Sequence, residues 1–147
     1  MIMNKEIEVL IVEDSESDAE MIIRALKKNN FANRLFHVSD GVEALDFLFG
    51  EGEYSDRQIA HTLKVILLDL KMPKLNGKEV LLKIKGDIRT KKIPVVMLTS
   101  SKEDPDIQEC YDLGANGYVV KPVEFSDFQK TITNLGLFWL LINEPPL

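Results

Sequence analysis

A chain of 147 residues has room for one domain of ordinary size. Hydrophobic residues at 45% and charged residues at 29% are typical of a globular protein with a packed core and argue against disorder. The net charge of −6 argues against a nucleic-acid or anionic-membrane surface, and neither a membrane span nor a signal peptide is evident, so we expect a cytoplasmic protein.

Short runs rich in Val, Ile and Leu alternate along the chain with amphipathic helical patterns. Four of the expected strands are nearly continuous apolar runs, typical of strands covered on both faces, whereas the second is mixed, as at a sheet edge. In chain order we expect strand Val9–Val12, helix Ser17–Asn29, strand Arg34–Val38, helix Val42–Phe49, strand Val65–Leu68, helix Lys78–Lys85, strand Val95–Leu98, helix Asp104–Leu113, strand Gly117–Val120 and helix Glu124–Ile142.

Local signals mark several helix ends. Ser17 and Glu20 have the spacing of a capping box. Asp104 is expected to cap the fourth helix, with Pro105 at its first position and Gly114 ending it. The polar stretch Gly50–Leu63 is expected to be a long loop with His61 on the surface, and Cys110 is expected to serve packing.

The last helix carries more apolar side chains than one core-facing stripe requires. The expected stripe comprises Phe125, Phe128, Ile132, Leu135, Trp139 and Ile142, while Leu137, Phe138, Leu140 and Leu141 fall on other faces. Two alternatives remain open: a homodimer or partner interface that includes this segment, or an end that folds back on its own domain.

Alternation of strands and helices predicts a doubly wound α/β fold, with a parallel sheet and right-handed crossovers. Ligands of such sheets bind outside the carboxyl ends of the strands. The residues that follow four of the five strands are Glu13-Asp14, Asp69, Thr99-Ser100-Ser101 and Lys121-Pro122.

Three carboxylates held close together would repel one another unless a cation lies among them. Mg²⁺ suits such a site because it prefers oxygen ligands and accepts phosphate oxygens as further partners. One carboxylate could then attack a phosphoryl group, while a lysine ammonium and a hydroxyl stabilise the charge on its oxygens.

These residues, with the run Leu67-Leu68-Asp69-Leu70-Lys71-Met72-Pro73, resemble the receiver domains of bacterial two-component response regulators of the chemotaxis-regulator type. The resemblance runs from about Glu8 to about Leu135. It implies a flavodoxin-like sheet of five strands in the order 2-1-3-4-5, and a single receiver domain over residues 1–147 with an extended C-terminal helix and tail over about 124–147.

The same resemblance implies a role for each strand-end residue. Asp69 would accept phosphate, and Mg²⁺ would be bound by Asp14, Asp69 and the backbone carbonyl of Lys71, with Glu13 acting through water. Thr99 and Lys121 would contact the phosphoryl group.

Further residues of the motif concern the switch. The small Ser100 would leave the phosphate accessible, and the Lys121–Pro122 peptide bond would be cis. Tyr118 would move when Thr99 moves, so that phosphorylation changes the face formed by the fourth helix, fifth strand and fifth helix. The Lys71 side chain could alter phosphate hydrolysis.

The implied partners are a histidine kinase or a histidine phosphotransfer protein. The C-terminal sequence Phe138-Trp139-Leu140 and the loop Gly50–Leu63 resemble stand-alone regulators that pair with phytochrome-type photoreceptor kinases. With no output domain expected, the signal would leave through protein contact.

Other function classes fit less well. A haloacid-dehalogenase phosphatase would need a second aspartate at the position of Lys71, and a flavodoxin would need a phosphate loop in place of the acidic Glu13-Asp14-Ser15-Glu16. A pseudo-receiver that has lost phosphorylation remains the alternative, although such a module usually lacks one of the residues present here.

Overall fold

The computed structural model describes residues 8–32, 34–55 and 63–144. Five parallel strands form one sheet in the order β2-β1-β3-β4-β5, as predicted. The strands are β1 (Glu8–Val12), β2 (Arg34–Val38), β3 (Leu63–Leu68), β4 (Val95–Thr99) and β5 (Gly117–Val120). The helices are α1 (Glu16–Lys28), α2 (Gly41–Phe49), α3 (Gly77–Lys85), α4 (Asp104–Asp112) and α5 (Phe125–Gly136).

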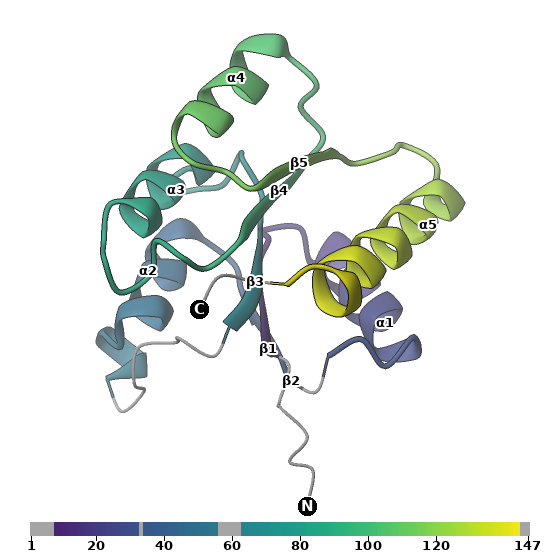
Figure 1. The fold of residues 1–147 in the computed structure, drawn as a ribbon, viewed down its shortest axis with the longest axis horizontal. Helices are drawn as coiled ribbons and strands as arrows, with labels where there is room; N and C mark the ends of the chain where they lie inside the picture. The colour runs from purple at the N-terminus through teal and green to yellow at the C-terminus, as the bar shows by residue number, and fades with distance from the viewer. Residues whose placement is uncertain (1–7, 33, 56–62, 145–147) are drawn as a thin grey trace, which may run out of the picture.

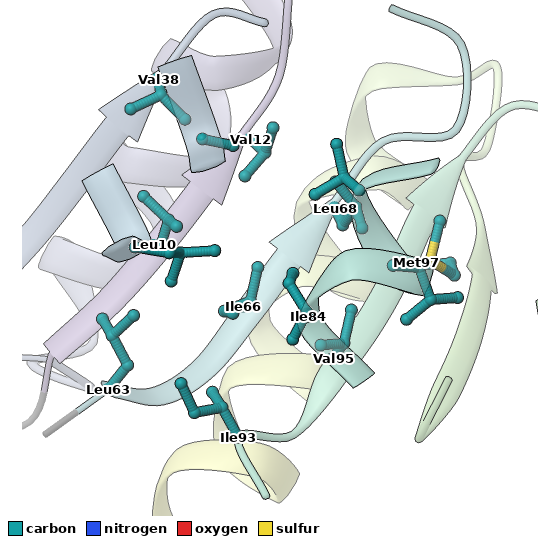
Figure 2. Close-up of a cluster of buried hydrophobic side chains, with 14 of the residues drawn as sticks. Leu10, Val12, Val38, Leu63, Ile66, Leu68, Ile84, Ile93, Val95 and Met97 are labelled. Atoms are coloured by element: carbon teal, nitrogen blue, oxygen red, sulfur yellow. The ribbon is translucent and has the colours of Figure 1, made fainter. Parts of the chain in front are cut away.

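Helices cover both faces of the sheet, α1 and α5 on one side and α2 and α3 on the other (Figure 1). Successive side chains of a strand point to opposite faces, so the central strands supply two cores. Leu10, Ile66 and Met97 belong to the core beneath α2 and α3 (Figure 2). Their neighbours Ile11, Leu67 and Val96 belong to the core beneath α1 and α5. This double burial explains the nearly continuous apolar runs of β1, β3 and β4.

The register of the sheet brings the strand ends to a common edge. Val12 pairs with Leu68, and Thr99 pairs with Val120. Glu13, Asp69 and Lys121 are therefore the first residues beyond three of the strands, and Thr99 ends a fourth.

Two helix starts differ from the prediction. The N-cap of α1 is Ser15, whose hydroxyl accepts the Asp18 N–H at 3.3 Å, so the predicted Ser17–Glu20 capping box is wrong. Helix α4 begins at Asp104 itself with Glu103 as its N-cap, one residue earlier than predicted. A serine or acid within the first turn resembles a cap in sequence, and only the backbone angles distinguish the two positions. Gly114 follows α4 with a φ of +106°, as expected of a helix-ending glycine.

The C-terminal segment is not one continuous α-helix. Helix α5 ends at Gly136, and Leu137–Ile142 forms a π-helical segment (η2), which includes a hydrogen bond from the Asn143 N–H to the Phe138 carbonyl at 2.6 Å. A π-helix takes up more residues per turn, so the predicted stripe loses its phase. Leu140 is buried, whereas Ile142, which was predicted to face the core, is 59% exposed. Phe125 begins α5, before this change of phase, and is 61% exposed, so its predicted place in the stripe is wrong as well.

The predicted loop after α2 contains a short 3-10 helix, η1 (Gly52–Tyr54), in its described part. His61 lies outside the described residues. None of the helices in the described part of the chain has the length and apolarity that a membrane crossing requires.

Candidate functional site at the carboxyl edge of the sheet

Glu13, Asp14 and Asp69 form an acidic cluster at this edge. Each offers a carboxylate oxygen, and these atoms all lie within 4.8 Å of one another. Asp14 is exposed, whereas Glu13 and Asp69 are buried. The cluster is thus open to solvent on one side and enclosed on the other.

The backbone fixes both buried acids. The Asp69 N–H donates to the Val12 carbonyl at 3.0 Å, and the Leu70 N–H donates to Asp69 Oδ1 at 2.8 Å. The Glu13 N–H donates to the Val38 carbonyl, and the Ser15 N–H donates to Glu13 Oε2 at 3.2 Å. These bonds leave the second oxygen of each carboxylate, Asp69 Oδ2 and Glu13 Oε1, facing Lys121.

The Lys121 ammonium is the cation of the site. It pairs with Glu13, lies 3.0 Å from Asp18 Oδ2 and 3.6 Å from Asp69 Oδ2, and its side chain is 9% exposed. Burial lowers the pKa of this ammonium, but the hydrogen bond to Glu13 and the charges of Asp69 and Glu13 outweigh burial and raise it. Lys121 therefore stays charged at neutral pH.

Burial also acts on Glu13. It raises the pKa of that carboxyl to about 8, helped by the charge of Asp69 and opposed by Lys121. This edge holds four carboxylates, those of Glu13, Asp14, Asp18 and Asp69, and the Lys121 ammonium contacts all of them except Asp14. The site is therefore short of positive charge, and its hard oxygen donors are of the kind that a divalent cation such as Mg²⁺ takes. The residues present fit such an ion.

Thr99 and Tyr118 lie beside this cluster on β4 and β5. Thr99 is buried, and its Oγ1 accepts the Ser101 N–H at 3.4 Å. The Tyr118 hydroxyl donates to the Ser101 carbonyl at 2.8 Å, and its ring packs against the core beneath α2 and α3. Ser100 is exposed between them, and the Lys71 side chain is exposed two residues beyond Asp69.

The predicted cis bond before Pro122 is wrong, because every peptide bond of the described residues is trans. The Lys121 N–H donates to the Thr99 carbonyl at 2.7 Å, and the ammonium is held by its carboxylate partners. Those contacts orient the Lys121 side chain while the Lys121–Pro122 peptide bond keeps the more stable trans form.

Two residues at this edge escaped the sequence reasoning. Asp18 contributes a carboxylate to the Lys121 ammonium from the first turn of α1. A prediction that began this helix earlier would have placed Asp18 nearer to the strand-end residues. Gly77 begins α3 directly against the Asp69 loop, where a Cβ would lie 2.3 Å from the Asp69 carbonyl oxygen. A glycine shortly after a strand-end acid is the signal that could have pointed to this close approach.

Comparison with known proteins agrees with this geometry. The family model described as response regulator receiver domain matches residues 9–133. The response regulator Rcp1 of Synechocystis sp. is 37% identical over 132 residues, which cover 90% of this chain and 88% of that protein.

Solved structures agree as well. The Mn²⁺-bound form of response regulator Rcp1 has a TM-score of 0.89 at 35% identity, with 97% of this chain and 99% of the other covered. The phosphorylated cyanobacterial phytochrome response regulator RcpA has a TM-score of 0.90 at 35% identity, with 98% and 100% covered. The bacteriophytochrome response regulator RtBRR is 47% identical with a TM-score of 0.75, and 98% and 85% are covered. The chain belongs to the response regulator receiver domain family and is a phosphoacceptor signalling protein that works with a histidine kinase or phosphotransfer protein.

Proposed function

We propose that Asp69 is the residue that accepts the phosphoryl group. The observation that carries this assignment is the position of Asp69 Oδ2, 3.6 Å from the Lys121 ammonium and within the carboxylate cluster, while Oδ1 is held by the Leu70 N–H. A carboxylate oxygen of Asp69 forms the new bond to phosphorus. The bond from phosphorus to the donor's imidazole nitrogen breaks, and its electron pair stays on that nitrogen.

The remaining residues assist this transfer in both directions. Asp14, Asp69 and the Lys71 carbonyl would hold Mg²⁺, with Glu13 acting through water, and the ion would neutralise charge on the phosphoryl oxygens. Lys121 pairs with one phosphoryl oxygen, and Thr99 donates its hydroxyl to another. Ser100 leaves room for the phosphodonor and for the water that hydrolyses the product.

The signal is read out through a change in shape. Thr99 moves toward the phosphoryl group, and Tyr118 and the Ser101 segment adjust with it, which alters the face formed by α4, β5 and α5. A pseudo-receiver usually lacks one of these residues, whereas all of them are present here, and no observation favours that alternative.

The kinase is of the phytochrome photoreceptor type. Two of the structures similar to this chain, RcpA and RtBRR, are described as a phytochrome and a bacteriophytochrome response regulator. Initial rates of phosphotransfer from a phytochrome-type kinase and from an unrelated histidine kinase test this assignment. A faster transfer from the unrelated kinase would contradict it.

The protein acts in the cytoplasm, as one receiver domain over residues 1–147 with an extension over about 124–147. It forms a homodimer through its C-terminal segment. Four large apolar side chains of η2 support this assembly, because Leu137, Phe138, Leu141 and Ile142 are 42–59% exposed.

Labelling with radioactive acetyl phosphate in Mg²⁺ tests the phosphoacceptor. The wild-type chain should incorporate label, and Asp69→Asn should incorporate none. Asp112→Asn is a matched control, since Asp112 lies at the exposed end of α4. Full labelling of Asp69→Asn would overturn the assignment, and removal of divalent ions with EDTA should abolish labelling of the wild type.

A further inference from the structure

A chain of polar contacts beside the acidic cluster joins α3, α4 and β5. Lys78 Nζ lies 2.8 Å from Asp106 Oδ1 and 2.5 Å from Glu109 Oε2. The Ser101 hydroxyl donates to Asp106 Oδ2 at 2.6 Å, and the Tyr118 hydroxyl donates to the Ser101 carbonyl. We call the residues Lys78, Asp106, Ser101 and Tyr118 the α3–α4 relay.

Helix α4 buries fewer of its residues than α1, α2, α3 or α5 does. Cys110 is the only fully buried residue of its nine, and the Glu103 side chain makes no capping hydrogen bond. In Figure 1, α4 lies at the rim of the molecule, beyond α3. Besides the packing of Cys110, the pairs that Lys78 makes with Asp106 and Glu109 connect α4 to α3.

Both members of the central pair are ionised at neutral pH. Hydrogen bonds to Asp106 and Glu109 raise the pKa of Lys78. Hydrogen bonds from Lys78 and Ser101 lower the pKa of Asp106, and the positive charge of Lys71 adds to this effect. The ionisation of Asp106 thus also depends on Lys71, the exposed lysine two residues after Asp69.

The relay touches the phosphorylation site at two places. Lys78 follows Gly77, whose N–H donates to the Leu70 carbonyl at 2.7 Å and whose Cα lies against the Asp69 carbonyl. Ser101 donates its N–H to Thr99 Oγ1. A displacement of Asp106 would therefore be felt at Thr99 through one intermediate residue.

We propose that Lys78 and Asp106 are positioning residues that hold the Thr99–Ser101 segment and Tyr118 in the arrangement from which Thr99 moves toward a phosphoryl group on Asp69. This inference rests on the proposed function. Because neither residue belongs to the acidic cluster, their loss should slow phosphorylation without weakening metal binding. The relay would then couple the face of α4 to the chemistry at Asp69.

The test compares Lys78→Met and Asp106→Asn with Lys102→Met, a matched control at an exposed position of the β4–α4 loop, next to Ser101. The measurements are the rate of phosphorylation by acetyl phosphate in saturating Mg²⁺ and the Mg²⁺ affinity by calorimetry. We expect both relay variants to be phosphorylated about fivefold more slowly than the wild type, because each breaks the same network of contacts. The control should match the wild-type rate, and the Mg²⁺ affinity should be unchanged in all three.

Two further variants separate positioning from general loosening. Lys78→Arg keeps the charge and should restore most of the rate. Asp106→Asn and Tyr118→Phe should combine less than multiplicatively, because both act through Ser101. Ser101→Ala removes a single hydroxyl, and it provides the same test if Asp106→Asn fails to fold.

Wild-type rates in the relay variants, or fully multiplicative effects with Tyr118→Phe, would overturn the inference. A loss of Mg²⁺ affinity in Lys78→Met that accounts for the slower rate would overturn it too. If the wild-type chain itself is not labelled at Asp69, the proposed function fails. If the wild type is labelled and the relay variants match it, only the present inference fails.

Discussion

Glu13 makes the stability of the metal-free protein depend on pH. Burial and the charge of Asp69 raise the pKa of this carboxyl to about 8 in the folded chain, above its ordinary value of 4.5. Between these values the folded state binds more protons at Glu13 than the unfolded state does. The stabilisation is therefore fully present below pH 4.5 and is lost as the pH rises toward 8.

We expect the melting temperature of the wild type in EDTA to fall relative to that of Glu13→Gln by about 3 °C or more between pH 5 and pH 8. Thermal denaturation followed by circular dichroism gives both curves. The comparison uses the slopes with pH, because Gln also changes the contact with Lys121. Parallel curves for the two proteins would show that Glu13 is ionised at both pH values.

At the scale of single elements, substitutions in and before the first turn of α1 can show which serine caps the helix. Ser15 accepts the Asp18 N–H, so Ser15→Ala should lower the free energy of unfolding by about 1 kcal/mol. Ser17→Ala is the matched control and should have a much smaller effect. Urea denaturation measures both, and a larger loss from Ser17→Ala would restore the capping box as the correct assignment.

In the π-helical segment, two neighbouring leucines differ strongly in burial. Leu140 is 1% exposed and Leu141 is 53% exposed. Leu140→Ala should cost about 3 kcal/mol of unfolding free energy because it leaves a cavity under η2. Leu141→Ala should cost little when measured at low protein concentration, where association makes no contribution. Equal losses in urea denaturation would indicate a different helical phase from the one described.

Strands were easier to predict than helix ends because their signal is strong. Burial on both faces makes β1, β3 and β4 nearly continuous apolar runs, and each was predicted to within two residues of its observed ends. The phase of the last helix could not be predicted, because an α-helix and a π-helix differ only in where each turn closes. Gly136 marks the change, since a Cβ there would lie 2.5 Å from the Phe31 ring.

The strand-end residues were predictable from order alone, since parallel strands bring their carboxyl ends to one edge. The relay was not predictable in this way. Lys78 and Asp106 lie on helices, 28 positions apart, and a lysine or an aspartate on an exposed helix face carries no signal of its partner. Only the packing of α3 beside α4 pairs them.

At the scale of the whole molecule, the C-terminal segment both folds back and presents an apolar face. Trp139 packs against the core beneath α1 and α5, and the Lys64 ammonium donates to the Leu140 carbonyl. This agrees with the second of the two sequence alternatives. Leu141 and Ile142 nevertheless remain more than half exposed, which keeps the dimer open to test.

Replacing Leu141 and Ile142 together by lysine should convert a dimer into a monomer, because two lysines from each protomer would be buried against like charges across a symmetric interface. Ile88→Lys is the control, since Ile88 is 80% exposed and lies between α3 and β4. Light scattering should give twice the chain mass of 16.7 kDa for the wild type and the control, and the single mass for the double variant. A monomeric wild type at the same concentration, with or without phosphorylation, would refute the dimer. A double variant that stays dimeric would place the interface on another face of the receiver.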